Sequence, residues 1–212
     1  MIVHLKENIS IEDAENISRD IEGKLIFNEK NKLIITSSKK NSISDIHEKF
    51  ISDKHILKSD IQLASRDYIK KTRKVKINNI EIGGDTNNTL MITGPCSIES
   101  KEQIRESANL LKKLNLTTLR AGCFKPRTSP YSFQGLGVEG LKMLSEIRDE
   151  FGFNIISEVK DASHVEDVIN YTDIIQIGAK AMYDHGILRE TGQQNKPVLL
   201  KRGFGSNLQE FV

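Results

Sequence analysis

Short apolar runs before residue 65 alternate with two stretches of helical spacing. They predict strands at 2–5, 24–27, 33–36 and 56–63 and helices at 11–21 and 42–50. The order is therefore strand, helix, strand, strand, helix, strand. This order predicts a small α+β, ferredoxin-like domain over residues 1–64, with two helices on an antiparallel sheet.

The pattern changes after a charged stretch at 65–74, which we interpret as a linker. Asn78 and Asn79 lie between apolar positions and predict a two-residue hairpin turn. Regular units then follow, with strands predicted at 90–93, 117–119, 154–157, 174–177 and 198–200 and helices at 101–114, 138–150, 162–171 and 184–193, before another helix opens at 207. This alternation predicts an α/β fold with a parallel sheet.

A complete (β/α)8 TIM-type barrel needs about 250 residues. Residues 75–212 provide about 140. We therefore expect this segment to hold the amino-terminal part of such a barrel, about five of its eight βα units, and the chain to be truncated within the barrel.

Composition narrows the functional classes. The 212 residues carry a net charge of +2, which gives no reason to expect a nucleic-acid partner, and no apolar stretch is long enough to predict a membrane span. The start lacks a basic run followed by an apolar core, so we expect no secretion signal and a cytoplasmic location. Cys96 and Cys123 are interpreted as thiols rather than as a disulfide framework. His4, His47 and His55 are interpreted as ordinary surface or boundary residues.

Cationic side chains follow several predicted strands of the second segment. Because the carboxyl ends of parallel strands form one ligand-binding edge, we expect these side chains to converge there. The set is Arg120, Lys125, Arg127, Lys180, Lys201 and Arg202. Clustered lysines and arginine forks match phosphate and carboxylate oxygens, so they indicate a small ligand with several anionic groups. Gly178 and Ala179 would let a backbone amide approach one of these groups.

Cys96 follows Gly94 and Pro95 at the same predicted edge. Nearby cations favour ionisation of a thiol, so Cys96 could be a nucleophile or a metal ligand. A small buried apolar role explains the residue equally well.

Four segments carry a resemblance to a known family: Gly94-Pro-Cys-Ser-Ile-Glu, the run from Arg120 to Gly137, Asp173-Ile-Ile-Gln-Ile-Gly-Ala-Lys and Lys196-Pro-Val-Leu-Leu-Lys-Arg-Gly. In order, over residues 75–212, they resemble 3-deoxy-D-arabino-heptulosonate 7-phosphate (DAHP) synthase. A weaker likeness over the first segment suits the subfamily with a ferredoxin-like regulatory domain. The resemblance implies condensation of phosphoenolpyruvate with erythrose 4-phosphate, the first step of the shikimate pathway, which leads to the aromatic amino acids.

The resemblance also implies roles for individual residues. Cys96 matches the metal-binding cysteine, and Arg120 and Lys125 match phosphoenolpyruvate contacts and are the expected catalytic residues. The segment Lys125, Pro126, Arg127 and Thr128 matches the part that receives erythrose 4-phosphate. Ala179, Lys180 and Lys201 match the phosphate site, although Lys180 stands where the family usually has arginine. A lysine provides charge there without a bidentate fork. Glu158 is a candidate for the site at its mouth, and a role as a partner that neutralises these cations explains it equally well.

The same resemblance implies one divalent metal ion, with Mn, Fe, Co or Zn as the alternatives, and an aromatic amino acid effector. It also implies a homo-oligomer at full length. The family completes its metal site with a histidine, a glutamate and an aspartate from later strands. We therefore expect the 212-residue chain alone to bind phosphoenolpyruvate weakly, to hold no stoichiometric metal and to be inactive.

Three alternatives stay open. The sister synthase that uses arabinose 5-phosphate, 3-deoxy-octulosonate 8-phosphate synthase, follows the equivalent lysine with Ala-Asn, where this chain has Pro126 and Arg127. A catalytically incomplete fragment with regulatory or binding capacity would fit the short barrel. A generic phosphosugar-binding barrel would explain the cations but not Cys96 together with the Lys125–Thr128 segment.

Overall fold

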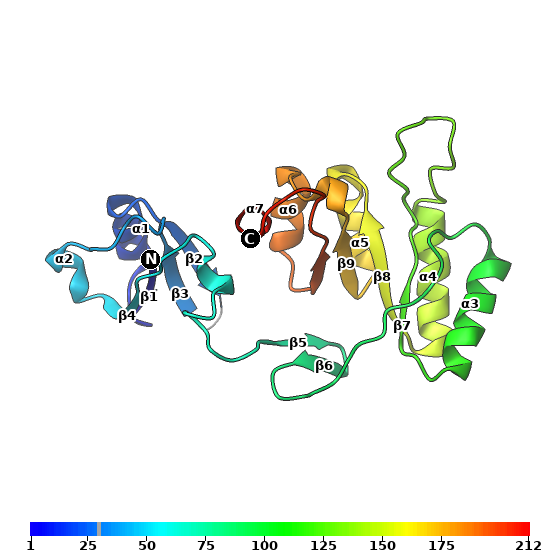
Figure 1. Cartoon of the computed structure of the whole chain (residues 1–212), viewed down its shortest axis with the longest axis horizontal. Coiled ribbons are helices and arrows are strands. Elements are labelled where there is room, and N and C mark those ends of the chain that lie inside the picture. Colours follow the sequence, from blue (N-terminus) through cyan, green and yellow to red (C-terminus); the bar gives the residue numbers. More distant parts are fainter. Residues whose placement is uncertain (29–30) are drawn as a thin grey trace. The chain divides into compact units, whose positions relative to one another are not determined.

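The computed structural model describes residues 1–28 and 31–212. Met1–Thr72 forms the body of one compact unit and Arg73–Asn207 the body of a second (Figure 1). Across these described ranges, no helix combines the length and the apolar character that crossing a bilayer requires.

The first unit is built on a four-stranded antiparallel sheet. Its elements are β1 (Ile2–Leu5), α1 (Ile11–Asp20), β2 (Lys24–Asn28), β3 (Asn31–Ile35), α2 (Asp45–Glu48) and β4 (Ile51–His55). The sheet order is β2-β3-β1-β4, so the first and last strands lie side by side. Val3 and Leu5 of β1 share a buried core with Ala14 and Ile17 of α1. The N-terminal antiparallel sheet with its predicted element order is therefore present.

Two elements of this unit differ from the sequence prediction. The helix expected over 42–50 is a single turn, and the strand expected at 56–63 lies earlier, at Ile51–His55. Residues Gln62–Ala64 form a 3-10 turn, η1. Ile46 and Ile56 are apolar positions of the predicted helix and strand, but they are 73% and 58% exposed in the structure. Their apolar character therefore did not reflect burial. Strand β4 lies at the edge of the sheet and exposes polar side chains, so it carries little hydrophobic signal.

The segment expected as a solvated linker partly packs on the first unit. The Tyr68 hydroxyl lies 2.9 Å from His4 Nε2, and the Tyr68 ring stacks on His4 and meets His55 edge-on. Burial, followed by the neighbouring His55, lowers the pKa of His4, while Asp53 opposes this shift. His4 and His55 therefore belong to one cluster that sequence reasoning did not foresee.

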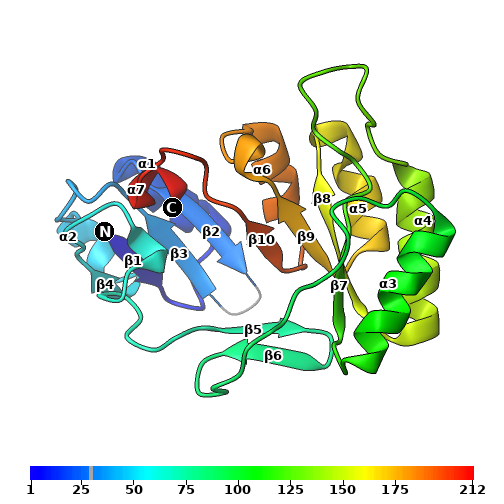
Figure 2. The same ribbon diagram turned by 45° about the vertical axis from the view of Figure 1, so that its right-hand side comes forward.

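The second unit begins with a hairpin and continues as a parallel sheet with intervening helices. Its elements are β5 (Lys74–Ile77), β6 (Ile80–Gly83), α3 (Lys101–Lys113), β7 (Thr118–Arg120), α4 (Val138–Phe151), β8 (Asn154–Val159), η2 (Ala162–His164), α5 (Val165–Tyr171), β9 (Ile174–Ile177), η3 (Ala179–Ala181), α6 (His185–Gly192), β10 (Val198–Leu200) and α7 (Leu208–Phe211). Figure 2 shows the hairpin, the four parallel strands and helices α3 to α6 together. The predicted hairpin turn at Asn78 and Asn79 is confirmed.

The parallel strands follow chain order, β10-β9-β8-β7. Sequential order is the order of a (β/α) barrel segment, whereas doubly wound sheets reverse direction at a switch point. The first strand expected in this segment, at 90–93, is not a regular strand. Thr93 and Ser97 form isolated parallel bridges with Leu119 and Gly122.

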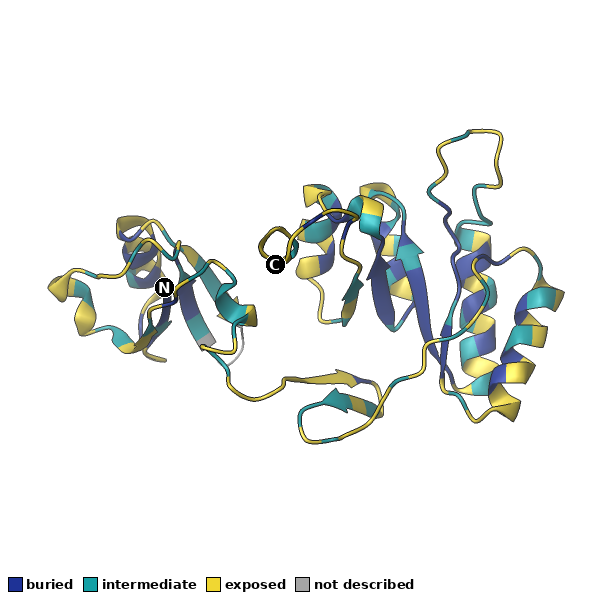
Figure 3. Ribbon diagram, in the orientation of Figure 1, coloured by how far each residue is buried: buried dark blue, intermediate teal, exposed yellow. Residues whose placement is uncertain are grey.

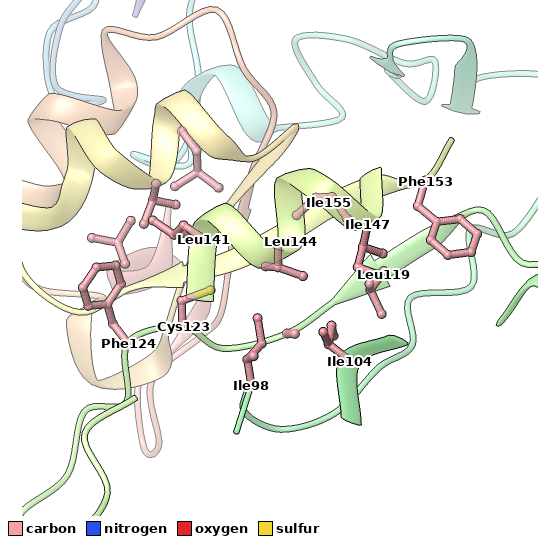
Figure 4. Close-up of a cluster of buried hydrophobic side chains, with 14 of the residues drawn as sticks. Ile98, Ile104, Leu119, Cys123, Phe124, Leu141, Leu144, Ile147, Phe153 and Ile155 are labelled. Atoms are coloured by element: carbon pink, nitrogen blue, oxygen red, sulfur yellow. The ribbon is translucent and has the colours of Figure 1, made fainter. Parts of the chain in front are cut away.

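Apolar side chains between the helices and the sheet form the main core of this unit. Leu141, Leu144 and Ile147 of α4 belong to one buried cluster with Leu119 of β7 and Ile155 of β8 (Figure 4). Buried residues run along β8 and β9 and along one stripe of α3 and α4 (Figure 3). Strand β9 is buried along its whole length, as expected for a parallel strand covered on both faces.

The hairpin closes the amino-terminal end of the parallel sheet. Ile77 of β5 packs with Ile156 and Ile174 of the sheet. The Asn78 side-chain amide donates to Asn154 Oδ1 at 2.8 Å and to Asp173 Oδ1 at 3.1 Å. The hairpin does not contact the carboxyl ends of the strands through these groups.

Candidate functional site

Three side chains from successive strands meet near the carboxyl end of the sheet. Arg120 ends β7, Glu158 lies in β8 and Gln176 lies in β9. Glu158 and Gln176 are paired in the register of β8 and β9. Their side chains therefore leave the sheet on the same face, beside that of Arg120.

Arg120 is held by acceptors from three directions. Its Nε donates to Gln176 Oε1 at 2.9 Å, its Nη2 to Glu158 Oε2 at 2.8 Å and its Nη1 to the Cys96 carbonyl at 3.1 Å. The Arg120–Glu158 ion pair is mostly buried, with 17% and 14% of the two side chains exposed. A guanidinium has five N–H donors, so this arrangement orients the group and leaves donors for a further acceptor.

Gly178 lets Glu158 lie against the end of β9. A Cβ atom built on Gly178 would lie 2.1 Å from Glu158 Oε1, closer than real Cβ contacts allow. Any side chain at 178 would therefore push the carboxylate away. Gly178, noted in the sequence for backbone access, thus has a steric role beside the carboxylate.

Lys125 joins the site from the loop after β7. Its ammonium donates to the Cys96 carbonyl at 2.9 Å and to Cys96 Sγ at 3.1 Å, and the residue is only 8% exposed. The hydrogen bond and the charge of Lys125 lower the pKa of the Cys96 thiol, and Arg120 and Arg127 add to this effect while partial burial opposes it. Cys96 is an exposed free thiol beside two cations.

Cys123 has the opposite environment. It is fully buried in the core beneath this loop, and burial raises the pKa of its thiol to about 11, although Ser157 and Arg120 act against the shift. Of the two thiols, Cys96 is therefore the one available for chemistry at neutral pH.

The other candidate residues surround this cluster in sequence. Pro126 is half-buried and Arg127 and Thr128 are exposed in the loop that leaves Lys125. Ala179 and Lys180 lie in η3, directly after β9, and Lys201 follows β10; both lysines are exposed. The Lys201 backbone N–H donates to the Ile177 carbonyl at 3.0 Å, which ties the start of its loop to β9. Arg120 and Lys125 both donate to Cys96, whereas Lys180 and Lys201 follow the next strands of the sheet with exposed side chains.

Sequence reasoning missed Gln176. It is 1% exposed and bonds to both Arg120 and Glu158. The available signal was a single polar residue within the apolar strand Ile174–Ile177. A polar side chain that is buried in a parallel strand needs a hydrogen-bonding partner, so its position indicates a polar site.

The residues of this site do not form a complete metal centre. Within 1–28 and 31–212, no group of three or more histidine, cysteine, aspartate or glutamate side chains is placed to hold a metal ion. Cys96 provides one sulfur ligand, and its Sγ accepts from Lys125. A divalent ion needs three or four protein ligands in fixed geometry, so Cys96 alone does not meet this requirement.

The α/β fold has a sequentially ordered parallel sheet, with an arginine and a lysine held at its carboxyl edge, and this is the order of strands in a segment of a (β/α) barrel. Residues 62–212 match the family model described as the DAHP synthetase I family. The chain belongs to this family.

Similar proteins agree with this assignment. A phospho-2-dehydro-3-deoxyheptonate aldolase of Thermotoga maritima is 41% identical over 151 residues, which are 71% of this chain and 44% of that protein. A 2-dehydro-3-deoxyphosphooctonate aldolase of Fusobacterium nucleatum is 33% identical over 142 residues, which are 64% of this chain and 51% of the relative. The chain thus spans about half the length of the curated relatives it matches.

Solved structures extend the likeness to both units. The crystal structure of the Thermotoga maritima DAHP synthase covers 99% of this chain with a TM-score of 0.67 and 33% identity, and the match spans 63% of that structure. A truncated form of the same synthase covers 72% of this chain with a TM-score of 0.64 and 34% identity. The N-terminal unit therefore has a counterpart in a solved DAHP synthase.

Proposed function

We propose that this chain provides the phosphoenolpyruvate-binding part of an enzyme that condenses phosphoenolpyruvate with erythrose 4-phosphate to DAHP and phosphate. The observation that carries the proposal is the contact between Lys125, Cys96 and the oriented Arg120 at the carboxyl end of the sheet, in a chain of the DAHP synthetase I family. Residues 75–212 would form the first part of a (β/α)8 barrel.

The proposed roles follow the chemistry of the side chains. Arg120 and Lys125 bind the phosphoenolpyruvate anion, and Lys180, Lys201 and the backbone at Ala179 bind a phosphate. Pro126, Arg127 and Thr128 receive the aldose phosphate. Two polyanionic substrates repel each other, so preoriented cations lower the free energy of bringing the two reacting carbons together.

In the proposed reaction the methylene carbon of phosphoenolpyruvate forms a bond to the aldehyde carbon of erythrose 4-phosphate. The C=C electrons of phosphoenolpyruvate form this bond, and the aldehyde oxygen takes up a proton. Water then adds to the carbon that carries the phosphate ester and gives up its protons. The bond between that carbon and the bridging ester oxygen breaks, so that inorganic phosphate leaves with the bridging oxygen and the water oxygen becomes the ketone of DAHP. A divalent metal is expected for the complete enzyme, with Cys96 as one ligand. Because the described residues provide no complete metal site, we assign no step to a metal here.

The arabinose 5-phosphate reaction is the second candidate. Relatives named 2-dehydro-3-deoxyphosphooctonate aldolase, which is another name for the sister synthase, also match, at 33–35% identity. Pro126 and Arg127 favour erythrose 4-phosphate. A substrate comparison separates the two: the enzyme that contains this chain should form product from erythrose 4-phosphate in preference to arabinose 5-phosphate. Preference for the five-carbon sugar would replace the proposal by its alternative.

The principal test measures the chain alone and the chain joined to the unmatched remainder of the Thermotoga maritima relative. The chain alone should bind phosphoenolpyruvate weakly in an NMR titration, with shifts that centre on Arg120 and Lys125, and it should not turn over. The joined protein should bind a divalent metal and release phosphate when both substrates are present. No phosphoenolpyruvate binding by either protein would reject the proposal.

Lys180 offers a sharper test within the joined protein. Lys180→Ala should raise the dissociation constant for phosphoenolpyruvate at least about tenfold, because a charge-assisted hydrogen bond contributes about 1.5–3 kcal/mol. Lys180→Arg should bind equally well or more tightly, since arginine adds a fork. An unchanged constant in the alanine variant would remove Lys180 from the site.

Residues 1–64 are proposed as a regulatory domain that responds to an aromatic amino acid, followed by a linker at 65–74. The observation behind this proposal is the separate antiparallel unit with a counterpart in a solved DAHP synthase. Deleting 1–64 from an active protein should preserve turnover and abolish inhibition by the amino acid. Inhibition that survives the deletion would contradict this role.

A further inference from the structure

We infer that Gln176 is a positioning residue that fixes Arg120 and Glu158 relative to each other; the inference rests on the proposed function of this site. Gln176 lies in the centre of the carboxyl-end cluster, on the fully buried strand β9. Its side-chain amide contacts both charged partners, at 2.9 Å to Arg120 Nε and at 2.6 Å to Glu158 Oε2.

The two hydrogen bonds of Gln176 have opposite directions. Its Oε1 accepts from Arg120 Nε, and its Nε2 donates to Glu158 Oε2. Rotating the amide by half a turn would place NH2 against an N–H and a carbonyl oxygen against a carboxylate. The charged neighbours therefore allow one orientation only, which assigns the oxygen and nitrogen atoms from the network itself.

The arrangement is a closed triangle of three side chains. Glu158 Oε2 also accepts from Arg120 Nη2 at 2.8 Å, so each of the three residues bonds to the other two. The three residues lie on β7, β8 and β9, which are neighbours in the sheet. Rotation of any one side chain breaks two of the three bonds, so the triangle holds the guanidinium plane in one place.

The consequence for binding is preorganisation. An arginine side chain that is free in solution loses rotamer entropy when it grips an anion. Here that loss has already occurred on folding, because Gln176 occupies Arg120 Nε and leaves N–H groups of the Nη atoms for a ligand. Glutamine is also neutral, so it orients Arg120 without cancelling its charge, which a second carboxylate at this position would do.

The alternative is that Gln176 is a core polar residue whose bonds only stabilise the fold. Both roles predict that its loss lowers stability. Only the positioning role predicts that Arg120 becomes mobile and that anion affinity falls. Measuring the mobility of Arg120 and the anion affinity therefore separates the two roles.

The experiment follows the Arg120 Nε–H signal by NMR in the 212-residue chain, assigned by its disappearance in Arg120→Lys. In the wild type this proton should exchange slowly with water. In Gln176→Met, which keeps the length of the side chain but removes both hydrogen bonds, the signal should exchange rapidly. The dissociation constant for phosphoenolpyruvate should rise about tenfold, as expected for the loss of one hydrogen bond that acts on a charged group.

Two further variants make the test specific. Thr191→Val removes another buried hydrogen bond, from Thr191 Oγ1 to the Ile187 carbonyl at 2.7 Å on α6, and it should leave both Arg120 exchange and phosphoenolpyruvate affinity unchanged. Gln176→Glu keeps an acceptor for Arg120 but opposes Glu158 until one of the two carboxyls is protonated. Base-catalysed exchange slows in every variant as the pH falls, so the two proteins are compared at the same pH. The ratio of the Arg120 exchange rate in Gln176→Glu to that in the wild type should fall towards one at low pH.

Slow Arg120 exchange and unchanged affinity in Gln176→Met would overturn the inference, as would equal losses in Thr191→Val. If Gln176→Met does not fold, Gln176→Glu decides, since a ratio of its Arg120 exchange rate to that of the wild type that does not change with pH rejects the positioning role. Exchange that depends on Gln176, together with no phosphoenolpyruvate binding by the wild type, would reject the proposed function and leave the Arg120 geometry intact.

Discussion

The two ends of the parallel sheet both carry networks of hydrogen-bonded polar side chains, but they use them differently. At the amino end, Asp173 Oδ2 accepts from the Ile155 backbone N–H at 2.8 Å and its Oδ1 accepts from Asn78. Lys196 donates to the backbone carbonyls of Ile169 and Thr172. These side chains satisfy backbone groups and close the end of the sheet beside the hairpin.

At the carboxyl end, cations outnumber their partners. Glu158 is the carboxylate in contact with Arg120, while the Lys125 ammonium donates to a carbonyl and a thiol. Lys180 and Lys201 add charge from the next two strand ends. A network of polar side chains is therefore not enough to indicate a binding site. The proposed site differs from the amino end in having N–H donors and positive charge without a matching acceptor, which an anion would satisfy.

The largest expected effect concerns Lys125. Lys125→Met should weaken phosphoenolpyruvate binding by about 10- to 150-fold, since a hydrogen bond to a charged group contributes about 1.5–3 kcal/mol. The free energy of unfolding should not fall in proportion, because a buried cation without a carboxylate partner does not stabilise the fold. Calorimetry with phosphoenolpyruvate and urea denaturation measure the two quantities.

Lys113→Met, at the exposed end of α3, is the matched control and should change neither quantity. If Lys125→Met lost stability but kept its affinity, Lys125 would belong with the structural network at the amino end, and the comparison would fail.

The second prediction concerns the amino end, where we expect a loss of stability without a loss of affinity. Asp173→Ala should lower the free energy of unfolding by about 2 kcal/mol, because the Ile155 N–H and the Asn78 amide lose their acceptor. In thermal unfolding this corresponds to a drop of about 4–8 °C for a chain of this size. Phosphoenolpyruvate affinity should stay unchanged below the transition.

Asp149→Ala removes an exposed carboxylate that pairs with Arg148 and should have little effect on stability. A loss of phosphoenolpyruvate affinity in Asp173→Ala at a temperature where the protein is folded would show that the two ends of the sheet are coupled.

The sequence predicted most of this sheet because its helices and buried strands have strong periodicity. Strand Val198–Leu200 and strand Ile174–Ile177 lie where the pattern placed them, and the strand-end rule brought Arg120, Lys125 and Cys96 together. Strand β4 was misplaced because an edge strand with polar side chains carries no apolar signal. The strand expected at 90–93 forms only isolated bridges, and Met91 and Ile92 are exposed.

Gln176 was missed for a different reason. Its role depends on cross-strand register, which aligns it with Glu158, and on the side-chain direction of Arg120 one strand further on. Local periodicity predicts neither the register nor the side-chain direction. Tyr68, which contacts His4, is 64 residues away from it, so sequence analysis could not predict that cluster either.

The third prediction concerns the core beneath the carboxyl end. Burial raises the pKa of Cys123 to about 11, so the folded protein holds this proton more tightly than the unfolded chain. The resulting stabilisation is complete below the unfolded pKa near 9 and is lost as the pH rises towards 11. At pH 10.5 the wild type should lose on the order of 1–2 kcal/mol relative to Cys123→Ala, with both compared with their values at pH 8.

Urea denaturation at the two pH values measures this difference, and the variant cancels the titration of lysines and tyrosines. Iodoacetamide provides an independent check, since it should modify Cys96 in the folded chain and Cys123 only after unfolding. Parallel loss of stability in both proteins would mean that the Cys123 thiol is not protected by the core.

The smallest expected effect concerns Thr118, where β7 begins near the amino end. Thr118 is fully buried, and its hydroxyl has no hydrogen-bond partner among the residues that the structure describes. Thr118→Val should therefore leave stability unchanged or raise it by up to about 1 kcal/mol, because a valine of similar shape removes an unsatisfied polar group.

Thr191→Val is the matched comparison: its hydroxyl donates to the Ile187 carbonyl, so the same substitution should cost about 1 kcal/mol there. Opposite signs in urea denaturation would show that hydrogen-bond partners, rather than burial, decide what a buried hydroxyl contributes to the stability of this unit. A loss in Thr118→Val equal to that in Thr191→Val would mean that the Thr118 hydroxyl is satisfied in solution by a bound water, and the amino end would then be less completely closed than its network indicates.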